Sequence, residues 1–219
     1  MIPGVEAESG TPGQLSRFER RERELEFSRI VAFSDGVFAI AITLLVLQLE
    51  VPESAADLGS SLKDALPDLF AFALSFAVLA RVWLFHHRLF AAMGSFDATL
   101  ITLNFLYLAL VTLVPFSCEL VGDYGEDRQA VIFYAVNMTL LGAIGAVIVT
   151  YAFRRDLIDT RTAHLVRIHP GPANWLVAGV FFFSIPVALL SPAAATIMWL
   201  SLFLLAGTVF NLLSRRARS

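Results

Sequence analysis

The sequence predicts an all-α integral membrane protein with six transmembrane helices and both termini in the cytoplasm. Of its 219 residues, 57% are hydrophobic and only 16% are charged, whereas soluble domains carry about 45–50% apolar and about 25% charged residues. Six apolar segments and a one-sided distribution of arginine point the same way. The net charge of −3 gives no basis for binding nucleic acid.

Six segments of the chain reach the length of about 20 apolar residues that a helix needs to cross a bilayer. They cover residues 28–49, 67–90, 97–120, 128–153, 173–190 and 192–213. Together they predict one transmembrane domain, 28–213. It follows a segment, 1–27, that is expected to be partly disordered and then a charged helix, and it precedes a basic tail, 214–219.

Most arginines lie in alternate connecting segments, which are therefore assigned to the cytoplasm. They are Arg17, Arg20, Arg21, Arg23, Arg29, Arg88, Arg154, Arg155, Arg161, Arg167, Arg215, Arg216 and Arg218. The intervening loops are mostly acidic. Glu50 and Glu53 follow the first span directly, where they would attract cations to the outer mouth of a pore.

The first span carries an apolar stripe interrupted by one hydroxyl. At about 100° per residue, one side of this helix gathers Ile40, Thr43, Leu44 and Leu47. The stripe could be a seam that packs against another helix. It could also line a pore shared by several copies of the chain, with apolar rings at Ile40 and Leu44 and with Thr43 offering oxygen ligands to a cation.

The same span also contains a carboxylate. An ionisable side chain at the centre of a membrane span costs about 2.5–3.5 kcal/mol on insertion scales, so Asp35 is expected to have partners. Matching the spans by depth predicts a polar network around Asp35, with Ser34, Arg81, His86, His87 and Asn104 as further members. A structural clamp is favoured over a proton relay, because the outer halves of the spans lack titratable groups.

No pattern in the sequence predicts an enzyme, a metal site or a bound cofactor. His86 and His87 point about 100° apart on a helix, so they cannot share one metal ion. The sequence has no Gly-rich phosphate loop and no Thr-Val-Gly-Tyr-Gly filter. It also lacks the repeated arginines of a voltage sensor. An ion channel of this sequence would have to select ions with its first helix.

Three motifs connect the first three spans. The first is Arg29-x-x-x-Phe-Ser-Asp35, followed by Gly-Val-Phe-Ala-Ile-Ala-Ile-Thr-Leu-Leu-Val-Leu. The others are Trp83-Leu-Phe-His-His-Arg-Leu-Phe90 and Asn104-Phe-Leu-Tyr-Leu108, the last leading to Pro115-Phe116. With these motifs the chain resembles the transmembrane protein 175 family of potassium channels, and most closely its single-repeat prokaryotic members. The resemblance covers about the first 125 residues.

The resemblance implies a homotetramer in which the first helix of each subunit lines a central pore. It implies a constriction at Ile40, Leu44 and Leu47 and a selectivity layer at Thr43. It also implies an interhelical network formed by Arg29, Ser34, Asp35, Trp83 and His86 or His87. The implied activity is that of a potassium-selective, voltage-insensitive leak-type channel in the bacterial inner membrane. Its partners would be membrane lipid and copies of the same chain, with K⁺ as the permeant ion and no cofactor.

Two other functions remain open at this point. A proton-coupled secondary transporter would use Asp35 and the histidines of the second span. A non-transporting membrane scaffold would use the apolar stripe only to pack subunits together.

Overall fold

The computed structural model describes residues 17–49, 59, 63, 65–159, 162 and 175–199. These residues are mostly helical and include no strand, only an isolated bridge between Met93 and Ile158. The helices are α1 (Arg17–Leu44), η1 (Leu45–Gln48), α3 (Leu66–Ala91), α4 (Ala98–Thr112), α5 (Val114–Tyr124), α6 (Arg128–Arg154) and α8 (Leu176–Leu190). Residues 192–199 are also helical.

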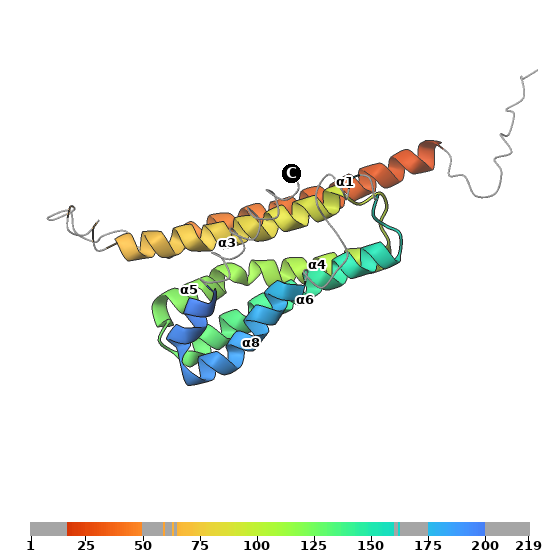
Figure 1. Cartoon of the computed structure of the whole chain (residues 1–219). Coiled ribbons are helices and arrows are strands. Elements are labelled where there is room, and N and C mark those ends of the chain that lie inside the picture. Colours follow the sequence, from red (N-terminus) through yellow and green to blue (C-terminus); the bar gives the residue numbers. More distant parts are fainter. Residues whose placement is uncertain are drawn as a thin grey trace, which may run out of the picture.

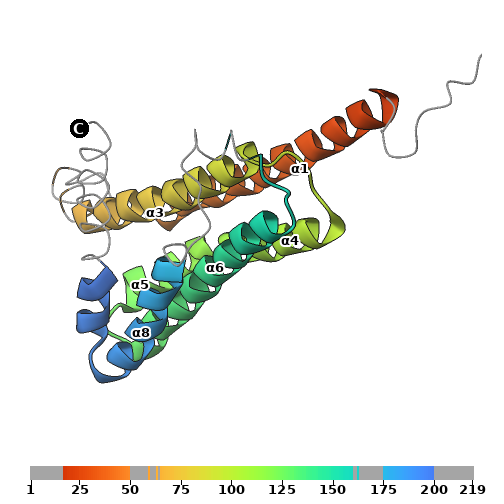
Figure 2. The ribbon, with the colours of Figure 1, turned by 45° about the vertical axis from the view of Figure 1, so that its right-hand side comes forward.

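The helices form two layers (Figures 1 and 2). In one layer α1 and α3 lie side by side and run in opposite directions, and the other layer holds α4, α5, α6 and α8. α1 packs against both α3 and α4, so it joins the two layers. In the second layer α6 packs against α4, α5 and α8.

The local sequence explains where several helices begin and bend. The Asp97 carboxylate accepts a hydrogen bond from the backbone N–H of Leu100 (2.8 Å) at the start of α4, and Asp127 caps α6 in the same way through Gln129 (2.6 Å). Such caps pair backbone donors that the first helical turn leaves free. Pro115 has no backbone N–H to donate, and it lies at the bend where α5 follows α4.

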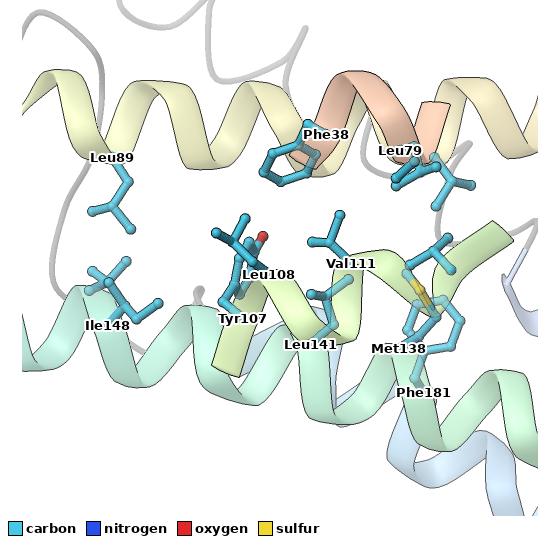
Figure 3. Close-up of a cluster of buried hydrophobic side chains, with 14 of the residues drawn as sticks. Phe38, Leu79, Leu89, Tyr107, Leu108, Val111, Met138, Leu141, Ile148 and Phe181 are labelled. Atoms are coloured by element: carbon cyan, nitrogen blue, oxygen red, sulfur yellow. The ribbon is translucent and has the colours of Figure 1, made fainter. Parts of the chain in front are cut away.

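An apolar core fills the space between the layers (Figure 3). Phe38 of α1 and Leu79 and Leu89 of α3 point toward the second layer, where they meet α4 side chains that include Tyr107 and Val111. None of these five side chains is more than 3% exposed. Between helices in a bilayer, close van der Waals packing of this kind is a main source of stability.

Two helices of the second layer, α6 and α8, approach each other closely at Gly142. A Cβ atom added there would lie 2.9 Å from the backbone nitrogen of Ala178 on α8. Gly145, one turn further along α6, is similarly closed in by the rings of Phe85 and Tyr107. Small residues at such positions allow helices to pack closely in membranes.

The fold is of the membrane type. Three described segments are long and apolar enough to cross a bilayer, namely Arg21–Leu47, Ala98–Tyr124 and Arg128–Arg154. α3 has 26 residues, which at 1.5 Å per residue span about 39 Å, more than the bilayer core of about 30 Å. α8 is shorter, with 15 residues.

The ends of α3 and α6 that carry arginines lie together. The backbone N–H of Gly94 donates to the carbonyl of Leu157, and that of Asp159 donates to the carbonyl of Ala92, each at 2.9 Å. These bonds place Arg88, Arg154 and Arg155 near one end of the molecule, toward which the N-terminal part of α1 also points (Figure 1). Arg128, which begins α6, lies at the opposite end of that helix.

Some predicted features lie outside the described residues. They are Glu50 and Glu53, residues 1–16, the second half of the segment 192–213 and the tail 214–219.

Candidate functional site

One face of α1 is joined to its neighbours by a chain of hydrogen bonds. The Ser34 hydroxyl donates to the carbonyl of Ile30 (2.9 Å) and accepts from the Asn104 side-chain amide of α4 (3.0 Å). The Asn104 side-chain oxygen lies 2.8 Å from Nε2 of His86 on α3. Because that oxygen can only accept, Nε2 must carry the hydrogen. Ser34, Asn104 and His86 are each at most 2% exposed, so three helices share one buried polar contact.

Aromatic side chains enclose the His86 imidazole. Its ring stacks on Phe90 (4.2 Å between centroids) and on Tyr107 (5.7 Å), and Phe38 of α1 lies 5.3 Å away at a tilt. No described side chain hydrogen-bonds the other ring nitrogen, Nδ1. The histidine is therefore held in one orientation by packing on its faces and by Asn104 at its edge.

Asp35 lies beside this chain but has a different partner. The indole Nε1–H of Trp83 on α3 donates to Oδ1 of Asp35 at 2.8 Å. His87 stacks on Trp83 with 5.2 Å between ring centroids, but it is itself exposed. The structure thus brings Asp35, Trp83 and His87 into a second, half-buried cluster next to the Ser34–Asn104–His86 chain.

Two charged residues of the predicted network lie apart from both clusters. Arg29 and Arg81 are exposed, and among the described residues neither joins the hydrogen bonds of Ser34 or Asp35. On α3, Arg81 lies five residues before His86, about 140° around the helix. It therefore points away from α1 although its depth is similar.

The opposite face of α1, which we call the free face, is exposed in the described part of the subunit. Ile40, Leu44 and Leu47 are 61%, 44% and 75% exposed, and Thr43 is exposed between them. The Thr43 hydroxyl donates to the carbonyl of Ile40 at 2.9 Å. Its oxygen lone pairs are therefore the polar feature that Thr43 presents outward. On such a surface the hydroxyl oxygen can coordinate a cation, and the apolar side chains around it do not bind water.

The backbone changes from α-helical to 3₁₀ geometry at the C-terminal end of this free face. α1 ends at Leu44 and continues as the 3₁₀ turn η1, Leu45–Gln48. A 3₁₀ turn has three residues per turn and is tighter than an α-helix. Leu47 therefore projects from a narrower winding than Ile40, and Leu45, in the same turn, is fully buried against the core.

Other polar contacts of the structure include at least one residue outside the first three spans, so matching those spans by depth does not predict them. Tyr151 of α6 donates to Oδ2 of Asp97 at 2.6 Å. This bond, more than any other contact, holds the pKa of Asp97 below its usual range. In the sequence, Asp97 stands directly before an apolar run, which is the pattern that predicts a helix N-cap.

Two further polar pairs lie inside the second layer. The Asn137 side-chain amide donates to the hydroxyl of Ser117 at 3.2 Å, and the indole of Trp199 donates to the hydroxyl of Ser184 at 2.9 Å. Both pairs connect consecutive apolar segments. Their signal was a polar side chain inside an apolar span, which in a membrane predicts a partner on a neighbouring helix.

The ionisable side chains near α1 are few and lie close together. Among the described residues there is no group of three or more His, Cys, Asp or Glu side chains that could hold a metal ion. The titratable groups near α1, Asp35, His86 and His87, lie at one depth and make no path across the bilayer within the described part.

Known proteins share this part of the chain. Residues 29–115 match the family model described as endosomal/lysosomal potassium channel TMEM175. These are the residues that hold the three motifs. A protein of Chamaesiphon minutus named as a potassium channel is 43% identical over 126 residues, which are 56% of this chain and 62% of that protein. The match therefore spans less than two thirds of that relative.

Two more relatives extend the comparison. A potassium channel of Streptomyces collinus is 36% identical over 143 residues, 64% of this chain and 68% of that protein. The Mus musculus protein named endosomal/lysosomal proton channel TMEM175 is 28% identical over 197 residues, 81% of this chain and 39% of its own length.

The fold also matches a solved structure. The crystal structure of a lysosomal potassium-selective channel TMEM175 homolog from Chamaesiphon minutus superimposes with a TM-score of 0.63 at 30% identity, covering 79% of this chain and 92% of that chain. Sequence motifs, family model and fold agree. The chain belongs to the TMEM175 family as a prokaryotic-type member, in a family of ion channels and not of enzymes.

Proposed function

We propose that the protein is a homotetrameric, potassium-selective leak-type channel whose pore is lined by α1. Each subunit contributes six transmembrane helices, with both termini on the cytoplasmic side of a bacterial inner membrane. The names of the relatives support a potassium channel. The observation that carries the pore assignment is the exposed hydroxyl of Thr43 among the exposed apolar side chains of Ile40, Leu44 and Leu47.

The fixed rotation of α1 supports this assignment. Ser34 and Asp35 are hydrogen-bonded to α4 and α3, so the helix cannot turn its free face inward without breaking both contacts. Thr43 lies nine residues after Ser34, which is about 180° around the helix. A single subunit would present this hydroxyl oxygen to lipid. Four subunits around an axis present it to water and ions.

Permeation follows from the side chains on the free face. Rings of Ile40, Leu44 and Leu47 close the pore by excluding water, and ions pass when the rings widen. A potassium ion that sheds water at this level is coordinated by the outward lone pairs of Thr43. Glu50 and Glu53, which follow the first span in the sequence, attract cations to the mouth. Conduction is insensitive to voltage, because no span carries repeated arginines.

Ion flux in proteoliposomes tests the proposal. The full-length protein is reconstituted and a potassium gradient is applied, with sodium in the matched experiment. Potassium-driven flux that exceeds sodium-driven flux is the expected result. Equal potassium flux in liposomes with and without the protein would overturn the proposal.

Two substitutions on α1 test the roles of its free face. Thr43→Ala removes the oxygen ligand and should weaken discrimination of potassium over sodium, whereas Ile40→Ala should increase the leak. Thr102→Ala is the matched control, because Thr102 is also exposed and bonds a backbone carbonyl of its own helix. Unchanged selectivity in Thr43→Ala would remove this residue from the filter.

The same liposomes separate the two rival functions. A proton-coupled transporter using Asp35, His86 and His87 would show saturating, pH-driven transport by a monomer or dimer. The naming of the mouse relative as a proton channel makes proton flux a necessary measurement. For a scaffold, Leu44→Asn would reduce assembly and leave conductance unchanged.

A further inference from the structure

The N-terminal part of α1 extends past the other helices (Figure 1). Phe27 stacks on Phe90 near the end of α3 and on Phe96 just before α4, with ring centroids 6.2 and 5.4 Å apart. These contacts mark the level at which the two-layer bundle ends. The helical residues 17–26 continue past that level by about 15 Å at 1.5 Å per residue. We call residues 17–26 the projecting segment.

The projecting segment carries two large apolar side chains among charges. Phe18 is 70% exposed and Leu25 is 58% exposed, although every residue from 19 to 24 is charged. The two are seven residues apart, and the same spacing continues to Ala32 and Ala39, both exposed. Residues seven positions apart recur on nearly the same side of an α-helix, because two turns take about 7.2 residues. These four side chains therefore form a line along which a second helix can pack, which we call the seam.

This seam lies on the free side of α1. Leu25 and Thr43 are 18 positions apart in the chain, about five full turns at 3.6 residues per turn, so they face the same way. Both lie about 180° from Ser34, on the anchored face. The seam therefore points in the direction that the proposed function assigns to the pore axis.

We infer that the projecting segments of the four subunits pack against one another around this axis and form a helical collar at the cytoplasmic entrance. The occupant of the Phe18 and Leu25 surface is thus a second copy of the same segment. The inference rests on the proposed function, because it uses the same tetramer axis.

The charges beside the seam are complementary for contact between copies. Arg21 lies about 40° to one side of Leu25 and Glu22 about 60° to the other, and both are exposed. In a ring with rotational symmetry, one flank of each copy meets the opposite flank of the next. The positive flank of one projecting segment therefore faces the negative flank of its neighbour.

Lipid fits this surface less well than a second copy. The projecting segment continues α1 beyond the level of Phe27, so Phe18 and Leu25 are carried away from the bundle and not along a bilayer surface. A lipid-bound amphipathic helix would lie in the plane of the membrane with a broad apolar face. Here the apolar face is one residue wide.

Cysteine cross-linking in liposomes tests the collar. In a full-length Cys118→Ser background, which removes the one native thiol, Leu25→Cys is compared with Arg23→Cys. Arg23 lies two residues before Leu25, about 160° away from it around the helix. Under mild oxidation, disulfide-linked dimers are expected at Leu25→Cys and few at Arg23→Cys. Potassium flux and subunit number are measured on the same samples.

The outcomes separate this inference from the proposed function. Equal or absent cross-linking at both positions, with a conducting tetramer, would overturn the collar and leave the channel intact. Absence of both a tetramer and potassium flux would overturn both.

A charge exchange supplies a second test. Arg21→Glu and Glu22→Arg should each weaken association of the tetramer about two- to fivefold for each contact between neighbouring subunits, as expected for an exposed ion pair. The double variant should restore it. If the double variant loses as much association free energy as the two single variants together, the two flanks do not contact each other.

Discussion

The two faces of α1 differ in almost every physical respect. On one face Ser34, Phe38 and Leu45 are at most 1% exposed and fixed by hydrogen bonds or packing. On the other, Ile40 and Leu47 are more than half exposed. The first face sets the rotation of the helix, and that rotation decides what the second face presents.

This division shows why polar residues in the first span do not all serve one purpose. Ser34 and Asp35 are next to each other in the chain, but they bond different helices, α4 and α3. Among the described residues, Thr43 bonds only the backbone of its own helix, whereas Ser34 bonds both its own backbone and Asn104. Hydrogen bonds between helices therefore identify the anchored face, and the Thr43 hydroxyl lies outside it.

The largest expected effect comes from the apolar centre of the anchored face. Phe38→Ala should lower the free energy of unfolding by about 3–5 kcal/mol, because it leaves a cavity beside His86 and Tyr107. Ile40→Ala should change that free energy by less than about 0.5 kcal/mol and alter ion flux instead. Denaturation in mixed micelles, followed by circular dichroism, measures both. Equal losses in the two variants would mean that the faces are not distinct.

The polar contact on the same face should come second. Asn104→Leu leaves the Ser34 hydroxyl and the His86 imidazole without their partner, and buried groups left unpaired cost about 1–3 kcal/mol. Thr102→Val, on the exposed side of the same helix, is the control for substitution in α4. The same denaturation experiment applies. An Asn104→Leu protein as stable as the control would show that the Ser34–Asn104–His86 hydrogen bonds contribute nothing to the anchoring of α1.

The sequence predicts how deep a site residue lies along its span, but not the direction in which its side chain points around the helix. Hydropathy and depth place Asn104 and His86 near Ser34, since both depend only on position along the span. Depth leaves open the rotation of each helix, which decides that Asp35 meets Trp83 while Arg81 points outward. Rotation depends on packing between distant residues such as Phe38 and Tyr107, and a single sequence does not contain that information.

The fold divides in the same way. Apolar length predicts membrane-type helices, but it places residues 97–120 in one span, which the structure divides into α4 and α5 around Leu113. The charged helix expected within residues 1–27 rests on helix-forming residues and not on hydropathy, and α1 begins at Arg17. The pairing of Tyr151 with Asp97 joins residues 54 positions apart, and only the folded arrangement of α4 and α6 brings them together.

A smaller effect is expected at the edge of the anchored face. Trp83→Phe keeps the ring but removes the N–H that Asp35 accepts, and hydrogen bonds between membrane helices contribute about 0.6 kcal/mol on average. Trp175→Phe, at an exposed position, is the matched variant. A small loss of stability with altered flux at Trp83 would show that the contact orients α1. A loss without any change in flux would assign it to stability alone.

The smallest effect at neutral pH is expected away from α1, at Asp97. The folded protein holds the pKa of this carboxylate below its ordinary value of 3.8. The stability it adds is therefore fully present above that value and is lost as the pH falls through the lower folded pKa. Asp97→Asn should retain the helix cap and flatten this acid dependence. Thermal unfolding measured between neutral and acidic pH checks the slope, and an unchanged slope in the variant would contradict the assignment.

The central test is whether the free face of α1 meets the permeating ion. In the Cys118→Ser background, Ile40→Cys is placed on this face and Leu106→Cys on the exposed side of α4. Potassium flux is recorded before and after addition of a charged, membrane-impermeant thiol reagent. The account predicts that modification blocks flux at Ile40→Cys and leaves it unchanged at Leu106→Cys. Flux that continues after complete modification of Ile40→Cys would contradict a pore lined by α1.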